Sequence, residues 1–302
     1  MSEAPIERVI ARVRGVYGRW RRDTPVAQMR ADWDELFASP VAAEVEPAVV
    51  GGVACQWVRP AGARRDAAIV YLHGGGFRMG SLISHREIMA RLAEAADAQV
   101  LGVDYRLAPE HPLPAALDDT LAVVEGLERT GFTRLALAGD SAGGALALGA
   151  MIALLQQGGR APAAAYLMSA WTDLTASGES YATRSHLDPI HRRAMILAVA
   201  RAALGANAAA DDPLLSPLFA EPETLRGLPP TLMQVGERET LVSDSEVFAA
   251  RARAAGAPVH CEIWPGMIHV FQQFPHDLPQ ARQAVAVGAR FLAAHLEGAE
   301  KL

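Results

Sequence analysis

The amino-acid sequence predicts an α/β fold in which a mostly parallel central sheet is flanked by helices. Three observations support this prediction. Short apolar runs typical of buried strands alternate with helical segments, and residues 67–103 form one strand–helix–strand unit. Residues 134–157 pass from an apolar run through a glycine-bounded turn into a helix. The chain has 302 residues, 51% of them hydrophobic, which is enough for one large α/β domain with a subsidiary piece.

The turn Gly-Asp-Ser-Ala-Gly around Ser141 is the most informative stretch. An apolar strand at 135–138 precedes it, and a helix from 143 to about 157 follows, as a GxSxG nucleophile elbow requires. Because Gly139 and Gly143 have no Cβ, they let the strand and the helix approach closely. We expect Ser141 in a strained backbone conformation with its hydroxyl exposed to a substrate. The alternative is a serine that only caps an ordinary helix.

The N-terminal residues 1–45 are predicted to be helical, because apolar side chains recur with helical spacing. They precede every predicted strand, so we expect them to pack on the main body as a separate piece. Residues 42–60 then change to short β segments. A buried strand at 67–72 runs directly into His-Gly-Gly-Gly-Phe at 73–77.

This glycine cluster predicts an oxyanion hole. Successive glycines at the end of a strand allow backbone N–H groups to face a bound anion. In acyl transfer the amides of Gly75 and Gly76, with Gly74 as a further candidate, would act together with the amide of Ala142. The alternative is a flexible loop. His73 precedes the serine in the chain, and we expect it to brace the glycine loop rather than to act as a base.

A helix at 83–96, a strand at 100–103 and a helix from 115 to about 129 are predicted next. Between the last two lies the proline-rich loop YRLAPEHP at 105–112. Its polar side chains are expected to have structural roles, as a hydrogen-bonded brace. These side chains are Arg106, Glu110 and His111.

With HGGGF, YRLAPEHP and GDSAGG in this order, the chain resembles the bacterial hormone-sensitive-lipase-like esterases of the α/β-hydrolase superfamily. The resemblance covers nearly the whole chain, and the stretch PLLSPL at 213–218 also fits it. Asp140 places the chain in the branch of the family that carries GDSAG. The resemblance implies the α/β-hydrolase fold and a carboxylic-ester hydrolase without a cofactor, preferring short to medium acyl chains.

The resemblance also implies a helical cap over the site. In the family, N-terminal helices and an insertion after a later strand form this cap. The cap is therefore expected at residues 1–45 and 177–212, and the catalytic domain at 46–176 and 213–302.

Such a hydrolase needs an acid and then a histidine after the serine. His260 lies within the predicted strand 259–264, and His295 lies within the C-terminal helix. His269 follows that strand in a loop, the setting in which the family has its catalytic histidine. We therefore predict His269 as the base, with His276 second.

Several acids follow the predicted strand 231–235. The pattern from Ser243 to Glu246 resembles a capping box that opens a helix through residue 255, which would give Glu246 a structural task and place Asp244 in the first turn. Glu239 occupies the position where the family usually has Asp-Pro-Leu, here Glu-Thr-Leu. Glu239 is therefore the predicted acid, and Glu237 and Asp244 remain open.

The predicted chemistry is acyl transfer by Ser141, His269 and Glu239 through an acyl-enzyme. The same triad would serve a lactone hydrolase or an acyltransferase, because pocket shape and water access choose the acceptor. A different class is a ligand-binding protein on the same scaffold. The family includes a plant hormone receptor that has lost its catalytic histidine, whereas this sequence retains a candidate.

Composition and charge argue against several other classes of protein. The net charge is −6 and the basic residues are dispersed along the sequence, so neither nucleic acid nor a membrane surface is an expected partner. Cys55 and Cys261 are too few for a disulfide framework and show no metal-ligand spacing, so no metal is predicted. The N-terminus lacks a signal-peptide core, and no stretch reaches transmembrane length, which predicts a soluble cytoplasmic protein. Members of the family are often dimers, but no interface is visible in the sequence.

Overall fold

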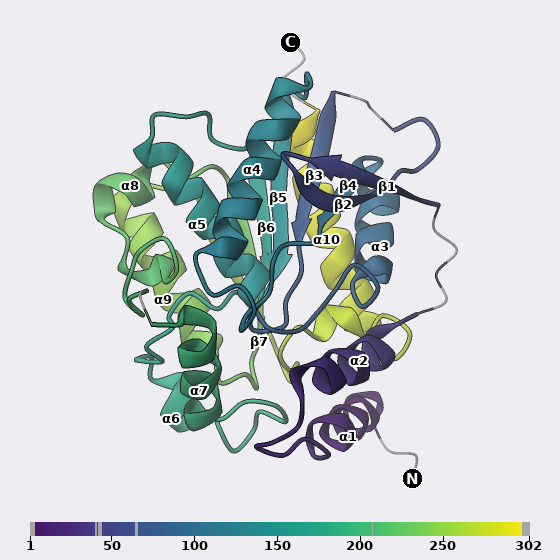
Figure 1. Ribbon diagram of the computed structural model, residues 1–302, viewed down its shortest axis with the longest axis vertical. Helices are drawn as coiled ribbons and strands as arrows, with labels where there is room; N and C mark the ends of the chain where they lie inside the picture. Colours follow the sequence, from purple (N-terminus) through teal and green to yellow (C-terminus); the bar gives the residue numbers. More distant parts are fainter. Residues whose placement is uncertain (1–3, 40, 42–43, 64–65, 207, 298–302) are drawn as a thin grey trace.

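An eight-stranded sheet runs through the computed structural model, which describes residues 4–39, 41, 44–63, 66–206 and 208–297 (Figure 1). The strand order is β1-β2-β4-β3-β5-β6-β7-β8. Strands β1 and β2 form an antiparallel hairpin, β2 is antiparallel to β4, and every other pairing is parallel. The strands are β1 Val45–Val50, β2 Val53–Val58, β3 Ala67–Leu72, β4 Gln99–Val103, β5 Arg134–Asp140, β6 Ala164–Met168, β7 Thr231–Gly236 and β8 Val259–Trp264. The α/β-hydrolase fold expected from the resemblance is confirmed.

Helices cover both faces of this sheet. On one face α4, α5 and α9 pack against side chains such as Val70 and Leu72, and on the other α3 and α10 pack against Ile69 and Tyr71. Side chains alternate between the two faces along β3, and because both faces are buried the strand is apolar throughout. The helices are α1 Pro5–Tyr17, α2 Val26–Phe37, α3 Arg86–Ala96, α4 Ala115–Arg129, α5 Ala142–Gln156, α6 Ser180–Thr183, α7 Arg193–Leu204, α8 Pro222–Arg226, α9 Val242–Ala255 and α10 Pro279–Leu296.

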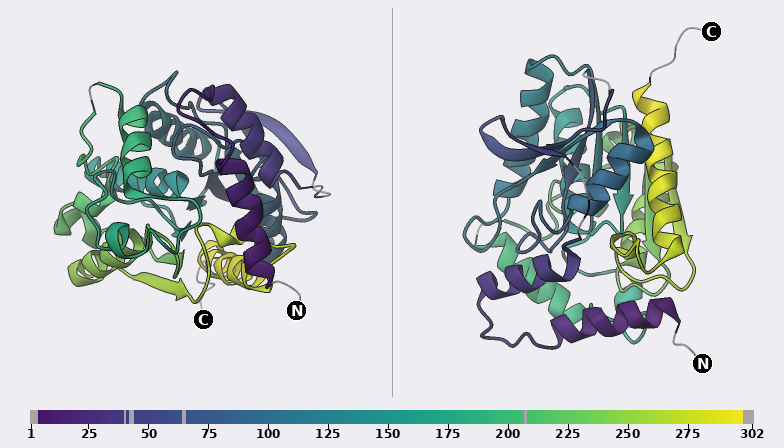
Figure 2. Two further views of the ribbon diagram at one scale, coloured as in Figure 1. Left: turned by 90° about the horizontal axis from the view of Figure 1, so that it is seen from below. Right: turned by 90° about the vertical axis from the view of Figure 1, so that its right-hand side faces the viewer.

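Four helices lie beyond the end of the sheet toward which the parallel strands point. These helices are α1, α2, α6 and α7 (Figures 1 and 2). In the right-hand view of Figure 2, α1 and α2 lie at the end of the molecule opposite the C-terminus. Apolar side chains of α1, including Val9 and Val13, pack against Phe271 and Phe274. The N-terminal helices therefore contact the loop that follows β8.

Two predicted helix starts differ from the structure. The helix expected from residue 83 begins at Arg86, because Ser81 and Ser84 bond to each other's backbone and hold the preceding residues in a turn. The prediction that residues 243–246 form a capping box at the start of a helix was wrong. Helix α9 begins at Val242, and Ser243 lies inside it with its Oγ 2.5 Å from Oγ of Ser180.

No helix in the described ranges is both long enough and apolar enough to cross a bilayer.

Candidate active site

Ser141 stands alone between β5 and α5, in a turn that small residues make possible. Its backbone is strained, with φ 51° and ψ −117°. A Cβ on Gly143 would lie 1.9 Å from the carbonyl oxygen of Leu72, so only glycine allows this approach of helix and strand. The N–H of Ser141 donates to the carbonyl of Met168 at 2.8 Å. The expected elbow geometry is therefore present.

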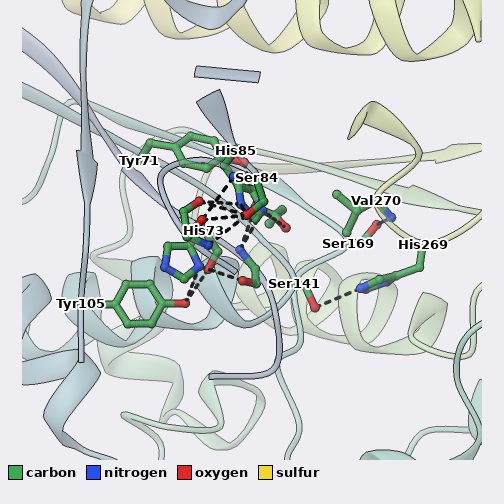
Figure 3. Close-up of polar contacts among 12 residues, drawn as sticks. Tyr71, His73, Ser84, His85, Tyr105, Ser141, Ser169, His269 and Val270 are labelled. Atoms are coloured by element: carbon green, nitrogen blue, oxygen red, sulfur yellow. Dashed lines mark hydrogen bonds and ion pairs between the residues drawn. The ribbon is translucent and has the colours of Figure 1, made fainter. Parts of the chain in front are cut away.

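Three predicted side chains form a continuous hydrogen-bonded chain. Nε2 of His269 lies 2.9 Å from Oγ of Ser141, a contact drawn in Figure 3. Nδ1 of the same ring lies 2.6 Å from Oε2 of Glu239. For the chain to be continuous, Nδ1 carries the proton and donates to Oε2 of Glu239, and Nε2 accepts from the serine hydroxyl.

The environment of His269 favours its protonated form. Burial disfavours the imidazolium, but the charge and hydrogen bond of Glu239 outweigh this effect and raise the pKa of His269. The carboxylates of Asp188 and Asp140 act in the same direction. A base with a raised pKa accepts a proton from a hydroxyl more readily.

Glu239 is held by groups that the sequence did not single out. Its Oε1 accepts a hydrogen bond from Oγ of Ser169 at 2.6 Å and a short one from the N–H of Gly236. Ser169 follows β6, and its Oγ also accepts the N–H of Val270 at 3.0 Å. Ser169 therefore ties the loop of Glu239 to the loop of His269. Figure 3 shows Ser169 beside Val270 and His269.

The other candidate acids and bases have different partners. Oε2 of Glu237 accepts the N–H of Gly266 at 2.8 Å. Asp244 is buried and accepts the N–H groups of Thr172 and Asp173 at 2.9 and 3.0 Å, so it holds the chain after β6. His276 lies 2.8 Å from Oε1 of Glu87. Of these three, none contacts Ser141 or His269 in the described structure.

The glycine loop offers amide donors near Ser141. Within the described residues the N–H groups of Gly75 and Gly76 have no acceptor, and Ala142 opens α5, where the first amides lack an intrahelical partner. The expectation for Gly74 needs correction. Its N–H donates to Oδ1 of Asp140 at 3.0 Å, because the carboxylate lies directly behind the loop.

Asp140 anchors the loop from within the core. Besides the Gly74 amide it accepts the hydroxyl of Tyr71 at 2.7 Å, and Nε2 of His85 lies 3.3 Å from Oδ1. Figure 3 shows Tyr71 and His85 close to each other behind Ser141. Burial alone would raise the pKa of Asp140, but the neighbouring His85 and the hydrogen bonds lower it. A buried ionised carboxylate thus holds the glycine loop in place.

His73 braces the loop, as expected. Its Nδ1 donates to the carbonyl of Gly74 at 2.8 Å, and its ring stacks on Tyr105 with centroids 4.3 Å apart. Burial lowers the pKa of His73 to about 3, so the ring is neutral at physiological pH. A neutral ring is suited to a structural role here.

The proline-rich loop is braced by partners outside itself. Arg106 pairs with Asp119 of α4 at 2.7 Å, and Glu110 pairs with Arg30 of α2 at 2.7 Å. Arg30 also donates to the carbonyl of Arg78 at 2.8 Å. The N-terminal helices are therefore tied to the glycine loop. His111 is exposed, and its backbone N–H donates to the carbonyl of Leu107 at 2.9 Å.

A second histidine, His191, packs against the first. The structure places its ring edge-on to that of His269, with centroids 4.5 Å apart. His191 lies just before α7, and its Nδ1 is 3.5 Å from Oδ2 of buried Asp188. Burial, followed by the proximity of His269, lowers the pKa of His191. No local motif marked His191, because its neighbour lies far along the chain.

An apolar pocket opens beside Ser141. It encloses about 50 Å³. Since a water-sized group needs roughly 10–15 Å³ by this measure, a chain of only a few heavy atoms fits. Aromatic and aliphatic side chains dominate its lining, among them Trp33, Phe37, Trp171, Val199 and Phe274. Among the described side chains, no three histidine, cysteine, aspartate or glutamate groups gather as a metal site would require.

Known proteins resemble this chain in sequence and in fold. A family model described as "alpha/beta hydrolase fold" matches residues 69–273. An acetyl-hydrolase of Streptomyces hygroscopicus is 41% identical over 246 residues, 80% of each chain, and an esterase of Acinetobacter venetianus is 37% identical over 85% of this chain and 84% of its own. The crystal structure of an esterase from the bacterial hormone-sensitive lipase family superposes with a TM-score of 0.91 at 38% identity, covering 98% of this chain and 100% of that one. The chain belongs to the hormone-sensitive-lipase-like esterases, a family of carboxylic-ester hydrolases with the α/β-hydrolase fold.

Proposed function

We propose that this protein hydrolyses carboxylic esters of short to medium acyl chains through an acyl-enzyme on Ser141. The contact of 2.9 Å between Nε2 of His269 and Oγ of Ser141 carries the proposal. As Oγ attacks the ester carbonyl, His269 takes the hydroxyl proton, and Glu239 stabilises the imidazolium that forms. His269 then gives the proton to the departing alcohol. Water repeats the sequence and releases the acid.

Negative charge develops on the carbonyl oxygen during each step. The amides of Gly75, Gly76 and Ala142 are the proposed donors to this oxyanion. Fixed donors of this kind stabilise the transition state by several kcal/mol. The small pocket beside Ser141 favours acyl chains of few carbons, which agrees with the preference that the family resemblance implies.

We assign the cap to residues 1–45 and 177–212. Support comes from the pocket lining, which combines Trp33 and Phe37 of α2 with Met195 and Val199 of α7. The proposed location is the cytoplasm.

The test is a series of p-nitrophenyl esters from acetate upward, assayed with wild type and Ser141→Ala. We expect turnover that peaks at short chains and that Ser141→Ala abolishes while keeping the melting temperature. Phenylmethylsulfonyl fluoride should add mass to the peptide that contains Ser141. Undiminished hydrolysis by Ser141→Ala would exclude this serine as the nucleophile. Adding an alcohol acceptor and identifying the products separates hydrolysis from acyl transfer.

A further inference from the structure

A second, larger hollow lies beside the Ser141 pocket and is lined by arginines. Its volume is about 630 Å³. The arginines come from three separate parts of the chain: the N-terminal helical region, the glycine loop and the segment before α7. We call this hollow the arginine groove. Its arginines are Arg14, Arg21, Arg22, Arg78 and Arg192.

The arginine groove adjoins the catalytic pocket. Tyr17, Ile190, Met195 and Val199 line both. The pocket beside Ser141 encloses only about 50 Å³, so the remote part of any larger ester must extend outward. The arginines line the hollow that these shared side chains also border.

The arginines of the groove are not neutralised by nearby acids. Some arginines elsewhere on the surface have carboxylate partners, as in the pairs Arg12–Asp277 and Arg238–Glu7. Across residues 4–39, 41, 44–63, 66–206 and 208–297, the five groove arginines form no ion pair, and no aspartate or glutamate lines the groove. The groove is therefore a positive patch on a chain of net charge −6.

Two of these arginines are held in place by backbone groups. Arg192 donates to the carbonyl of Asp188 at 2.6 Å, and Arg21 donates to the carbonyl of Gly18 at 2.6 Å. Carbonyl acceptors orient a guanidinium but leave its charge uncompensated.

Arg78 occupies a distinctive position. It belongs to the same loop as Gly75 and Gly76, it is partly buried, and its Nε has no acceptor within the described residues. The charge of Glu110 reaches Arg78, but that carboxylate is itself held by Arg30 at 2.7 Å. A partly buried guanidinium that lines the groove is suited to pair with an anion there.

We propose that the arginine groove selects esters that carry an anionic group, a carboxylate or a phosphate, at the end remote from the scissile carbonyl. This inference rests on the proposed ester hydrolysis and narrows its substrate class. Guanidinium groups bind both kinds of anion through paired N–H donors. Apolar side chains such as Trp20 and Met195 lie between the arginines, which suits a ligand with an apolar body and a charged end. The positive field also raises the encounter rate with anionic substrates.

The test compares esters that differ only in the terminal charge. One series contains monoethyl esters of dicarboxylic acids and the ethyl esters of monocarboxylic acids with the same number of carbons. The other contains acetates of ω-hydroxy acids, of ω-hydroxyalkyl phosphates and of plain alcohols. Hydrolysis is followed by pH-stat titration. The charge preference is the ratio of kcat/KM for the charged ester to that for its neutral match.

We expect wild type to prefer charged esters at one chain length, at which the anion reaches the groove. Arg14→Gln and Arg22→Gln are exposed substitutions, and each should lower the charge preference about 2- to 5-fold. The double variant should lower it further, and 0.5 M NaCl should act in the same direction. Arg290→Gln, an exposed arginine of α10 outside the groove, is the matched control and should keep the preference.

Two results would overturn the arginine groove as an anion site while leaving the esterase intact. One is an equal or lower kcat/KM for charged esters at every length, and the other is a preference that survives in the double variant. A folded wild type that hydrolyses no ester would instead overturn the proposed function. In that case calorimetry with monoethyl adipate and diethyl adipate tests the groove independently, because tighter binding of the monoester must disappear in the double variant.

An anionic lipid surface could supply the same negative charge to the groove as a small anionic ester. Sedimentation with phosphatidylglycerol and with phosphatidylcholine vesicles distinguishes these two ligands. Arginine-dependent binding to the phosphatidylglycerol vesicles, without a preference for small charged esters, would overturn the proposed substrate class.

Discussion

The ring of His191 stands nearly perpendicular to the ring of His269, with an interplanar angle of 85° and centroids 4.5 Å apart. Asp188, three residues before His191, accepts the backbone N–H of His191 at 2.9 Å and that of Thr240 at 2.7 Å. Thr240 directly follows Glu239. The segment 188–191 therefore contacts His269 through one ring and the loop of Glu239 through one carboxylate.

We expect His191 to act as a positioning residue for His269. His191→Ala removes the ring that restrains the imidazole and should lower kcat about 10- to 100-fold, since small misplacements of catalytic groups have effects of this size. His191→Phe keeps a flat ring and should restore most of the activity. Because its lowered pKa keeps His191 neutral near pH 7, the acid limb of the pH–rate profile should not move in His191→Phe. Equal activity of the alanine and phenylalanine variants would contradict a positioning role.

The pH dependence of hydrolysis should reflect the raised pKa of His269. The base works only when it is neutral, so activity should fall as the pH drops through its pKa. This acid limb should lie above about 6.5, the ordinary value for histidine. Glu239→Gln removes the main group that raises this pKa, and should therefore shift the limb to lower pH and reduce kcat about 10³- to 10⁴-fold.

Glu237→Gln is the matched control for this substitution. It lies two residues away in the same loop and accepts only a backbone N–H of Gly266 in the described structure. Its activity should stay within a few-fold of wild type, as measured by kcat/KM on p-nitrophenyl butyrate. A larger loss in Glu237→Gln than in Glu239→Gln would assign the acid to Glu237.

The glycine loop should tolerate no side chain at Gly75. This residue has φ +118°, and a Cβ there would lie 2.2 Å from the carbonyl oxygen of Met79. Gly75→Ala must displace the loop and its amide, so kcat should fall about 10²- to 10³-fold. Gly62→Ala is the control, because it also has positive φ, +84°, but open space around it. Similar losses of activity in both variants would mean that the amide of Gly75 has no special role.

Asp140 should stabilise the fold and the glycine loop together. Asp140→Asn weakens the acceptors for Tyr71 and for the Gly74 amide, which should lower the free energy of unfolding by about 1–3 kcal/mol at pH 7. The folded-state pKa of Asp140 is lowered, so its contribution is fully present above about pH 4 and is lost as the pH falls through the folded value. Urea denaturation of wild type and Asp140→Asn at several pH values measures the difference in their free energy of unfolding. A stability difference that grows below pH 4 would contradict the assignment.

Local sequence was sufficient for the parts of the site that one short segment builds. The turn at Ser141 needs glycine on both sides because of backbone clashes within a few residues and with the adjacent strand. The three successive glycines of the glycine loop likewise indicate a backbone without side chains. The hydrogen bond from the Gly74 amide to Asp140, however, joins residues that are 66 positions apart in the sequence. Strands buried on both faces were evident from their continuous apolar composition.

Contacts between distant segments determined the parts of the site that local sequence could not predict. Glu237, Glu239 and Asp244 are all acids after one strand, and only the course of the backbone brings Glu239 to His269 while Asp244 turns toward Thr172. The arginines of the groove are dispersed in the sequence, and they become one positive surface because three separate segments converge beside the pocket. Charge and hydrogen bonding act through space over a few ångströms, so residue spacing along the chain cannot reveal partners that folding alone brings together.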